Sequence, residues 1–468
     1  MKSKKVLLID PSWEIESSHN IWRNIGSCLP SLGLAYIAAY LEKNSFGVRI
    51  LDCTVDNIGP DKLKRIFARM ETPSYIGLTA TSPLIKNAFQ IAVLARQYFP
   101  EAKIILGGVH PSVETEESLG QPAVDAVVRG EGEETFLEVV KGLPFESIKG
   151  LSYKKDGKFI HNESRPLISD LDKIPAPAYH LLPMKKYYPA IGSYRRLPAM
   201  SLFATRGCPG RCTFCYRTFA GKVRKRSAEN IMAEVELLYR DYGIREIAFY
   251  DDSFTVFKKE VFRFCELLEE KKLDISWSCF TRADLVNKKL LLAMKRAGCH
   301  LILFGVETAD EQIMKNIRKN LSLDKVVKNV RFAHRIGIDT RASFMLGNQG
   351  ETVETVKKTI KFALKLKPRQ VQFNIATAYP GTELYLWAKE NGYLVDEDKY
   401  DYNMSDVNLS LPTISPERLR FYYNYAHRKF YLNPYTIIGH ILSLRTLTQF
   451  WEYVKGFAAV LYVFTHKR

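Results

Sequence analysis

The segment SLFATRGCPGRCTFC, residues 201–215, leads from a strand-like apolar run directly into a loop that holds three cysteines. Cys208, Cys212 and Cys215 have the spacing C-x3-C-x2-C. Four thiolates would close a tetrahedral zinc site or ligate every iron of a cubane cluster. Three thiolates leave one coordination position open, so this loop decides both where the active site lies and what it can bind.

A series of alternating strands and helices begins with this segment. The predicted strands lie at 201–205, 245–252, 275–280, 300–307, 339–346 and 370–377, and the predicted helices at 227–242, 258–272, 287–297, 309–335, 352–366 and from 383. Six strand–helix units in succession predict a partial (β/α)6 barrel, and such barrels carry their active sites at the carboxyl ends of the strands. We therefore expect the cysteine loop at that rim of a domain spanning 199–392.

Residues 1–145 show an earlier alternation of the same kind. Short apolar strands are predicted at 6–10, 48–52, 75–80, 103–108 and 123–130, with helices at 32–43, 87–99 and 133–142. This pattern predicts an α/β fold with a doubly wound parallel sheet that binds its ligand at the carboxyl ends of the strands. Residues 146–198 are predicted to form a linker with a small hairpin turning at Asp156-Gly157, and residues 393–468 a helical C-terminal region.

The composition is that of a folded protein with an excess of positive charge. The chain has 468 residues, 25% of them charged, and a formal net charge of +17. Such a charge attracts nucleic acid, anionic lipid and phosphorylated substrates alike. The run YRTFAGKVRKR, residues 216–226, interleaves cations with aromatic residues, which favours as one alternative an iron–sulfur protein that binds nucleic acid. The other interpretation is a diffusely basic, solvated surface.

Cysteine usage indicates the compartment. The five cysteines outside the loop are scattered singly through apolar stretches, which argues against a disulfide framework and favours a reducing cytoplasm. The N-terminal residues MKSKKVLLID run straight into a predicted strand without the longer apolar region and cleavage site of a secretion signal. We therefore expect a cytoplasmic protein.

The cysteine spacing, with Phe214 before the third cysteine and the loop following the first barrel strand, resembles that of the radical S-adenosylmethionine (SAM) superfamily. The resemblance implies a [4Fe-4S] cluster held by Cys208, Cys212 and Cys215, whose fourth iron binds the amino and carboxylate groups of SAM. It also implies reductive cleavage of SAM to methionine and a 5′-deoxyadenosyl radical, with electrons from a donor such as flavodoxin or ferredoxin. Zinc binding is the competing interpretation, but no fourth cysteine or C-x-H partner follows nearby.

The same resemblance implies SAM contacts at the ends of three later strands. Asp251 and Asp252 stand where relatives receive the SAM amino group, although an aspartate pair after a strand is also a common helix cap. Glu307 is implied to accept hydrogen bonds from the ribose hydroxyls. Arg282 is implied to pair with the SAM carboxylate or a substrate acid, or it forms a surface ion pair. The segment MLGNQGET, residues 345–352, resembles the GxPGET loop of relatives, with glutamine in place of proline.

The N-terminal sheet resembles the cobalamin-binding domain of the B12-dependent radical SAM class. Ser82 and Leu84 match its S-x-L element, and Gly107 and Gly108 its glycine pair, which together accommodate the nucleotide tail of the cofactor. Glycine suits a place where backbone must approach a ligand closely. A relict domain without a cofactor is the alternative.

The D-x-H-x-x-G box that supplies a histidine ligand to cobalt in B12 mutases has no counterpart in this chain. Asp56 stands where the histidine of that box would be. Cobalamin is therefore implied to lack a histidine ligand on its lower face. His110 is either a neighbour of that face or a solvent-facing loop residue.

The class implies cobalamin-dependent methylation of an unactivated carbon in a small-molecule or lipid substrate. Its members also include the anaerobic magnesium-protoporphyrin monomethyl ester cyclase and hopanoid-tailoring enzymes, so cyclisation, oxidation or C–C coupling of a hydrophobic substrate, a lipid or a tetrapyrrole, stays open. In this enzyme interpretation, nucleic acid is not an expected partner.

Two apolar stripes at helical spacing mark the C-terminal region. The first comprises Leu419, Tyr422, Tyr423, Ala426 and Phe430, and the second Phe450, Val454, Phe457, Ala458 and Leu461. Such stripes either pack onto the barrel, lie on a membrane surface, or cover a hydrophobic substrate. The apolar part is too short to span a bilayer.

Overall fold

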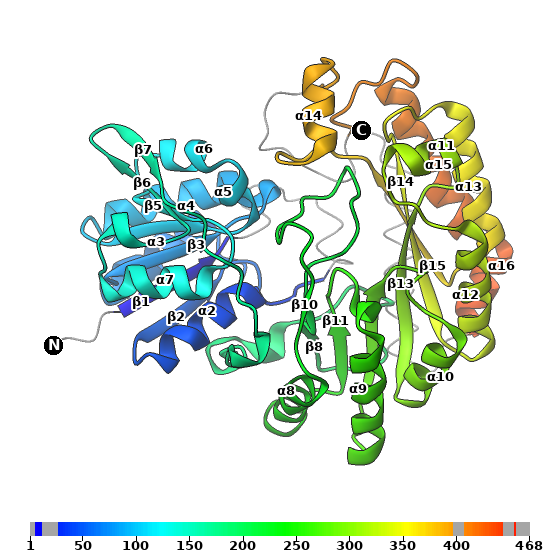
Figure 1. The fold of residues 1–468 in the computed structure, drawn as a ribbon, viewed down its shortest axis with the longest axis horizontal. Coiled ribbons are helices and arrows are strands. Elements are labelled where there is room, and N and C mark those ends of the chain that lie inside the picture. The colour runs from blue at the N-terminus through cyan, green and yellow to red at the C-terminus, as the bar shows by residue number, and fades with distance from the viewer. Residues whose placement is uncertain (1–4, 12–26, 396–406, 443–453, 455–468) are drawn as a thin grey trace. The chain divides into compact units, whose positions relative to one another are not determined.

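The computed structural model describes residues 5–11, 27–395, 407–442 and 454. The chain divides into two compact units, one built mainly from Cys28–Tyr187 together with the first strand, the other mainly from Tyr188 onward. Each unit is described by itself below, with the labels of Figure 1. In the described part of the chain, no helix is both long and apolar enough to cross a membrane.

The N-terminal unit contains a seven-stranded sheet in the order β2-β1-β3-β4-β5-β6-β7. The first five strands run parallel to their neighbours, as predicted, and the last two are antiparallel. The strands are β1 (Lys5–Asp10), β2 (Gly47–Asp52), β3 (Tyr75–Thr79), β4 (Lys103–Gly107), β5 (Ala126–Val128), β6 (Leu151–Lys155) and β7 (Lys158–His161).

Helices cover both faces of this sheet (Figure 1). Apolar side chains of α3 and α4 pack on one face, and those of α2 and α7 on the other, so the doubly wound arrangement is confirmed. The helices are α2 (Leu32–Lys43), α3 (Pro60–Arg69), α4 (Ile85–Tyr98), α5 (Val109–Val113), α6 (Thr115–Gly120) and α7 (Gly132–Lys141), and a short 3-10 helix, η1 (Ser82–Leu84), precedes α4.

The hairpin β6–β7 turns at Asp156 and Gly157 as expected, but it is not part of a linker. Strand β6 pairs antiparallel with β5 and extends the sheet, and the compact unit continues to Tyr187. The predicted boundary at residue 145 therefore differs from the observed division. Turn chemistry is local and readable, whereas the partner of an added strand is set by tertiary pairing.

The second unit contains a curved sheet of six parallel strands in the order β8-β11-β12-β13-β14-β15. This is the open (β/α)6 arrangement that the alternation predicted. The strands are β8 (Ala199–Leu202), β11 (Glu246–Phe249), β12 (Ser276–Thr281), β13 (Cys299–Glu307), β14 (Asp339–Leu346) and β15 (Gln370–Ile375).

Helices lie along the outer side of this sheet (Figure 1). Aromatic packing of Phe249, Phe264 and Trp277 joins helix α9 to strands β11 and β12, with ring centroids 5.3–5.9 Å apart. The helices are α8 (Ala228–Asp241), α9 (Lys258–Lys271), α10 (Lys288–Arg296), α11 (Glu311–Asn316), α12 (Leu323–Arg335), α13 (Val353–Leu366) and α14 (Glu383–Glu390).

The C-terminal helices α15 (Pro416–Tyr431) and α16 (Pro434–Leu442) follow, and α15 packs on the edge strand β15. Leu419, Ala426 and Phe430 of the first stripe are buried. The Tyr431 hydroxyl donates to the Val371 carbonyl at 2.6 Å. This stripe therefore packs on the barrel and is not free to lie on a membrane surface. The second stripe lies outside the described residues except for the exposed Val454.

Candidate functional site at the carboxyl ends of the barrel strands

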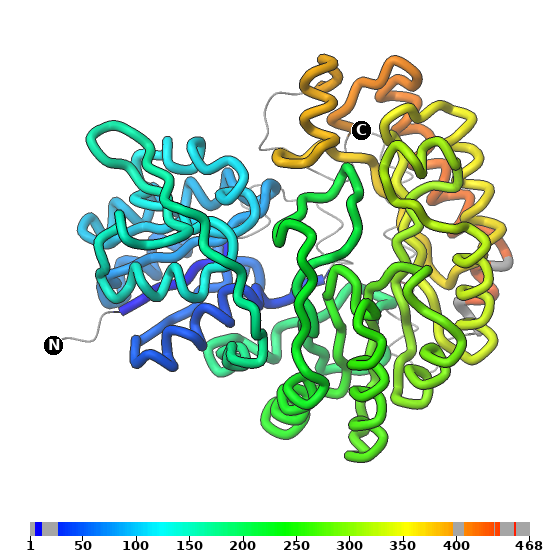
Figure 2. Tube along the Cα trace, viewed as in Figure 1, coloured from blue at the N-terminus to red at the C-terminus, as the bar shows by residue number. Residues whose placement is uncertain are grey.

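The cysteine loop extends from the barrel, and its two ends are held together by a pair of short strands. Strands β9 (Thr205–Arg206) and β10 (Arg224–Lys225) pair antiparallel there, and Figure 2 traces the loop between them in green. Gly207 has a φ of 99°, and a Cβ there would lie 2.3 Å from the Lys222 carbonyl oxygen. Glycine is therefore required at this tight entry to the loop.

Thr213 anchors the far end of the loop to the rest of the unit. Its backbone N–H donates to the Ile317 carbonyl at 3.2 Å, and its carbonyl accepts from the Leu384 N–H at 2.9 Å. These bonds fix the backbone of Thr213, which lies between Cys212 and Phe214. Both of these neighbours are half-buried. The segment that the sequence singled out is thus held in place before any ligand binds.

Two of the three thiols, those of Cys208 and Cys212, lie close to Gly210 in this loop. The position of a Cβ on Gly210 would lie 3.3 Å from Cys208 Sγ and 3.8 Å from Cys212 Sγ. Burial raises the pKa of the Cys212 thiol, and it raises the pKa of Cys215 to about 12, with the Asp252 carboxylate adding to the effect. Binding iron to these thiols would therefore release protons.

No three His, Cys, Asp or Glu side chains among the described residues converge on the position of a single metal ion. In a cubane cluster each cysteine ligates a different iron, so its ligands need not converge in this way. The residues present fit a cluster with one iron left for an exogenous ligand.

Two cations, Lys319 and Arg282, flank the cysteine loop. Lys319 is 8% exposed and its Nζ lies 3.1 Å from Glu307 Oε1. Burial opposes the charged form of this lysine, but the nearby Glu307 and Cys212 outweigh it, so the pKa of Lys319 is raised. Its charge in turn partly offsets the effect of burial on the pKa of Cys212. Sequence reasoning missed Lys319.

Arg282 is fixed by its neighbours with one side toward the thiols. Its Nε and Nη2 donate to the two carboxylate oxygens of Asp284 at 3.0 Å each, and Nη2 also donates to the Lys319 carbonyl at 3.0 Å. Its Nη1 lies 3.7 Å from the Cβ position of Gly210. The predicted alternative of an ion pair is realised, although this pair is partly buried and lies against the cysteine loop.

Glu307 is held in an unusual backbone conformation where β13 ends. Its φ is +73°, a left-handed value that costs energy in any residue but glycine, and the pairing of β13 with β14 shifts register here. A Cβ on Gly305 would lie 2.6 Å from Glu307 Oε1 and 2.9 Å from Lys319 Nζ. Gly305 therefore leaves the room in which this carboxylate and the lysine meet.

The two adjacent aspartates, Asp251 and Asp252, differ in burial and in contacts. Asp251 is buried, and its carboxylate accepts from the Ala204 N–H at 3.0 Å and the Thr205 hydroxyl at 2.6 Å. Burial raises the pKa of Asp251 to about 6 despite these bonds. Asp251 thus holds the entry to the cysteine loop, whereas Asp252 is exposed beside Cys215.

The loop after β14 is organised by the buried Glu351. Its carboxylate accepts from the Thr355 hydroxyl at 2.5 Å and from the Asn348 N–H at 3.3 Å, and burial raises its pKa to about 7. The side-chain amide of Asn348 donates to the Met345 carbonyl at 2.8 Å. These bonds shape the loop although Gln349 stands where relatives have proline.

The predicted cobalamin contacts meet at the carboxyl ends of β3 and β4 in the N-terminal unit. Thr79 pairs with Gly107, and Ser82 and Leu84 follow in η1. Gly108 has a φ of 97°, and a Cβ there would lie 2.7 Å from the Ala80 carbonyl oxygen. The structure thus brings the S-x-L element and the glycine pair together, and the Ala80 backbone leaves room only for glycine at position 108. Their contact with the nucleotide tail of cobalamin stays a prediction.

His110 is buried and does not face solvent. It is 1% exposed, and its two ring nitrogens contact Ser82 and Glu117. Asp56, in the frame of the missing box, forms an ion pair with Lys186. The predictions that no histidine of that box ligates cobalt and that His110 is a neighbour of the lower face of cobalamin stay predictions. The solvent-facing interpretation of His110 was wrong, because its burial is set by the packing of α5 and α6.

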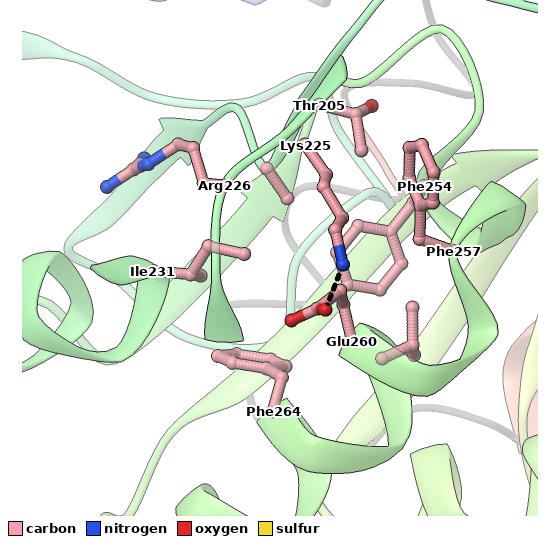
Figure 3. Close-up of a pocket in the computed structure, with 10 residues that line it drawn as sticks. Thr205, Lys225, Arg226, Ile231, Phe254, Phe257, Glu260 and Phe264 are labelled. Atoms are coloured by element: carbon pink, nitrogen blue, oxygen red, sulfur yellow. Dashed lines mark hydrogen bonds and ion pairs between the residues drawn. The ribbon is translucent and has the colours of Figure 1, made fainter. Parts of the chain in front are cut away.

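Two cations of the basic run at 216–226, Lys225 and Arg226, form ion pairs within the second unit. A small hollow between α8 and α9 is lined by Phe254 and Phe264, and the ion pair of Lys225 with Glu260 closes it (Figure 3). Arg226 is 7% exposed and pairs with the buried Glu234 at 2.6 Å. These two cations support the packing of α8 and α9.

Comparisons with known proteins agree with this geometry. Residues 202–363 match the model of the radical SAM superfamily, and residues 19–140 match that of the B12 binding domain. An uncharacterized methyltransferase of Pyrococcus horikoshii is 36% identical over 95% of this chain and 96% of its own length. The chain belongs to the radical SAM superfamily, in its cobalamin-binding branch. Its cofactors are therefore a [4Fe-4S] cluster, SAM and cobalamin, and the family is one of enzymes.

Other members of the branch have diverse names. The cytidylyl-2-hydroxyethylphosphonate methyltransferase of Streptomyces wedmorensis is 29% identical over 86% of this chain and 84% of its own. The anaerobic magnesium-protoporphyrin IX monomethyl ester cyclase of Rubrivivax gelatinosus is 28% identical over 85% of this chain and 72% of its own. The structure of the radical enzyme OxsB with aqua-cobalamin bound superposes with a TM-score of 0.72 at 18% identity, covering 97% of this chain and 71% of that one. This last likeness shows a shared fold.

Proposed function

We propose that this radical SAM enzyme transfers a methyl group to an unactivated carbon of a small organic substrate, with Cys208, Cys212 and Cys215 as the cluster ligands. The observation that supports this most directly is the pair of cations beside the three thiols at the carboxyl ends of the barrel strands. Two fixed cations, Lys319 and Arg282, stand beside a loop that provides three ligands for four irons. When bound, the cluster and SAM supply a 5′-deoxyadenosyl radical, and cobalamin supplies the methyl group.

The residues around the thiols have distinct proposed roles. Asp252 is exposed next to Cys215 and is the carboxylate available to the SAM amino group. Glu307, fixed by Lys319, accepts hydrogen bonds from the SAM ribose. Arg282 offers its remaining Nη1 side to the negative charge of the loop or of the SAM carboxylate. Asp251 contributes indirectly, because it fixes the backbone at Ala204 and Thr205 from which the loop departs.

The choice of methyl transfer over cyclisation rests on the relatives. A relative named as a methyltransferase is 36% identical, whereas the cyclase of Rubrivivax gelatinosus is 28% identical. The substrates in the names of the relatives differ from one another, so none of them is carried over to this chain. We propose a small molecule as substrate, a reduced flavodoxin or ferredoxin as electron donor, and a reducing cytoplasm, in keeping with eight cysteines that are all free thiols.

The test is anaerobic reconstitution with iron, sulfide and hydroxocobalamin, followed by SAM and a reductant and by mass spectrometry of the products. Methyl transfer predicts both 5′-deoxyadenosine and S-adenosylhomocysteine. 5′-Deoxyadenosine alone would favour cyclisation, oxidation or coupling. A Cys212→Ser variant is the matched control, since it should lose 5′-deoxyadenosine formation while the N-terminal unit still takes up hydroxocobalamin. Salt-sensitive RNA binding without SAM cleavage would instead support the nucleic-acid alternative.

A further inference from the structure

The segment that carries the three cysteines has an unusual charge. Residues 201–228 contain seven lysines and arginines and no aspartate or glutamate. The whole chain has 68 basic residues against 51 acidic ones, so the two signs are far more evenly mixed elsewhere. Local positive charge of this kind raises the concentration of an anionic partner near it and steers that partner toward it.

The structure divides these cations into paired and exposed ones. Lys225 and Arg226 form ion pairs with carboxylates of α9 and α8. Arg211, Arg217 and Lys222 are exposed, and within the described part of the chain no ion pair joins any of these three to a carboxylate. The cysteine loop therefore presents three positive charges at the surface of its unit.

The backbone after the third cysteine presents two of the exposed cations from one ordered turn. Arg217 Nη2 donates to the Ala220 carbonyl at 3.3 Å, and the Lys222 N–H donates to the Phe219 carbonyl at 2.9 Å. A Cβ on Gly221 would overlap the Arg217 guanidinium, so glycine leaves the space in which this side chain folds over the turn. The charges are thus held in place while they remain exposed.

The aromatic residues of the same loop are less exposed than its cations. Phe214, Tyr216 and Phe219 are half-buried, and the Arg224 guanidinium lies over the Phe219 ring, 5.0 Å from its centroid. Single-stranded nucleic acid is held by aromatic faces on which its bases stack as well as by cations. Exposed cations beside half-buried rings favour a partner recognised by charge alone, such as an acidic protein surface.

We propose that Arg211, Arg217 and Lys222 form the docking surface for a small acidic protein that carries one electron to the cluster. The inference rests on the proposed function, because it takes the three cysteines to hold a redox-active cluster. An electron passes only over a short distance, so the carrier must dock close to the segment that holds the cluster. A flavodoxin would give one electron and go from hydroquinone to semiquinone, and no bond forms or breaks.

Charge-changing substitutions at two of these residues test the surface. The double reversal Arg217→Glu with Lys222→Glu replaces two positive charges by negative ones, whereas Lys222→Arg keeps the charge. Lys361→Glu on α13 is the matched control, because Lys361 is also exposed but lies on an outer helix of the same unit. All of these side chains are exposed, so we expect unchanged thermal unfolding, which checks that each variant folds.

The first measurement is binding without turnover, by calorimetric titration of the reconstituted protein with oxidised flavodoxin. At low ionic strength we expect the double reversal to weaken binding by at least about tenfold, and Lys222→Arg and Lys361→Glu to stay within about twofold of wild type. Lys222→Glu alone should give a smaller loss of the same kind. The losses should shrink in about 0.5 M salt, which screens exposed charges. Equal affinities of wild type and double reversal at low salt would overturn the proposal.

The second measurement compares two reductants by the rate of 5′-deoxyadenosine formation. With reduced flavodoxin at low salt we expect the double reversal to be slower by about tenfold, the scale of electrostatic steering. With photoreduced 5-deazariboflavin, which is uncharged and needs no docking surface, the rates should be equal. A similar loss with both reductants would show that these cations serve the loop itself, and it would overturn the inference.

The same arms separate this inference from the proposed function. A wild-type protein that forms no 5′-deoxyadenosine with 5-deazariboflavin would contradict the proposed function, whereas one that forms it equally fast with and without the reversals in the presence of flavodoxin would overturn the docking surface alone. Polyuridylic acid tests the nucleic-acid alternative. Its binding lost in the double reversal, with flavodoxin affinity unchanged, would assign the cations to nucleic acid and overturn the proposal.

Discussion

The buried pair of Lys319 and Glu307 is the most informative contact at the scale of single residues. Taking two charges out of water costs free energy that their attraction only partly offsets, so such a pair is weak evidence for stability alone. Here the lysine comes from the turn before α12, stands beside the thiols, and holds a carboxylate in left-handed backbone. A role beside the cysteine loop explains the presence of this buried pair better than stability does.

Replacing Lys319 by methionine should leave Glu307 buried without its partner, which costs about 3–5 kcal/mol for such pairs. We expect SAM affinity of the reconstituted protein, measured by calorimetric titration, to fall by at least about tenfold, with a lower Tm. Arg318→Met is the control, because its pair with Glu383 is about half exposed. Wild-type SAM affinity in Lys319→Met would contradict the assigned role of Glu307.

Asn substitutions should distinguish the neighbouring aspartates. Asp251→Asn keeps one acceptor oxygen but loses the negative charge that strengthens the hydrogen bonds from two backbone N–H groups and a hydroxyl, so we expect the free energy of unfolding to fall by about 1–3 kcal/mol. Asp252→Asn should weaken SAM binding while leaving the Tm of the apoprotein unchanged. Thermal unfolding and SAM titration of both variants check this, and the reverse pattern would exchange the two roles.

The sequence was enough to single out the three cysteines but not the residues that surround them. The spacing of Cys208, Cys212 and Cys215 is local and chemically specific, whereas Lys319 is one of several cations in the run NIRKN and nothing local marks it. Asp251 and Asp252 are adjacent, and only tertiary contacts decide which one turns inward. Residue type and spacing therefore indicate the proposed ligands, and the tertiary contacts show which residues lie around them.

At the scale of elements, the parallel strands β1 and β2 end in adjacent carboxylates. Asp10 pairs in register with Asp52, whose carboxylate accepts from the Tyr187 hydroxyl at 2.8 Å. Burial, together with the charge of Asp52, raises the pKa of Asp10 to about 8. Because the folded protein binds this proton more tightly than the unfolded chain, the contribution of Asp10 to stability falls as the pH rises from about 4 to about 8.

Asp10→Asn should remove that pH dependence. Below the unfolded pKa of the carboxyl both proteins carry a neutral side chain, so their Tm values should be similar near pH 4. As the pH rises toward 8, we expect the variant to become more stable than wild type by several degrees, because it has no charge to bury. Thermal unfolding across this range is the measurement, and parallel curves for the two proteins would contradict it.

Helix α15 tests whether the tail belongs to the barrel. Leu419 is 1% exposed and packs on Gly347, where a Cβ would lie 2.5 Å from Leu419 Cδ2. Leu419→Ala should lower the free energy of unfolding by about 2–5 kcal/mol, as for other buried leucines. Phe421, which is 62% exposed on the same helix, provides the control, and Phe421→Ala should change stability little. Equal effects of both changes would argue against this packing.

Elements were more predictable than their partners. The helix after Ser415 and Pro416 follows from local capping, since Ser415 Oγ accepts from the Arg418 N–H at 3.3 Å. The hairpin β6–β7 was placed in a linker because its turn is local, while its pairing with β5 joins residues about 25 apart. Sequence pattern thus determined element type well, and sheet membership less well.

At the scale of the whole molecule, the two units place their candidate sites by the same rule. In each, parallel strands end at one edge, and the residues implicated in cofactor binding follow directly after those ends. Within the basic run at 216–226, Lys225 and Arg226 pair with carboxylates of the same unit. Net charge alone therefore does not identify the binding partner of this protein.

The central claim concerns the iron that the three cysteines leave without a protein ligand. Electron paramagnetic resonance of the anaerobically reconstituted and reduced protein, with and without SAM, tests it most directly. We predict a [4Fe-4S] signal that changes on addition of SAM and is lost in Cys212→Ser. A site that binds zinc in place of iron, or an iron signal that SAM leaves unchanged, would contradict the account.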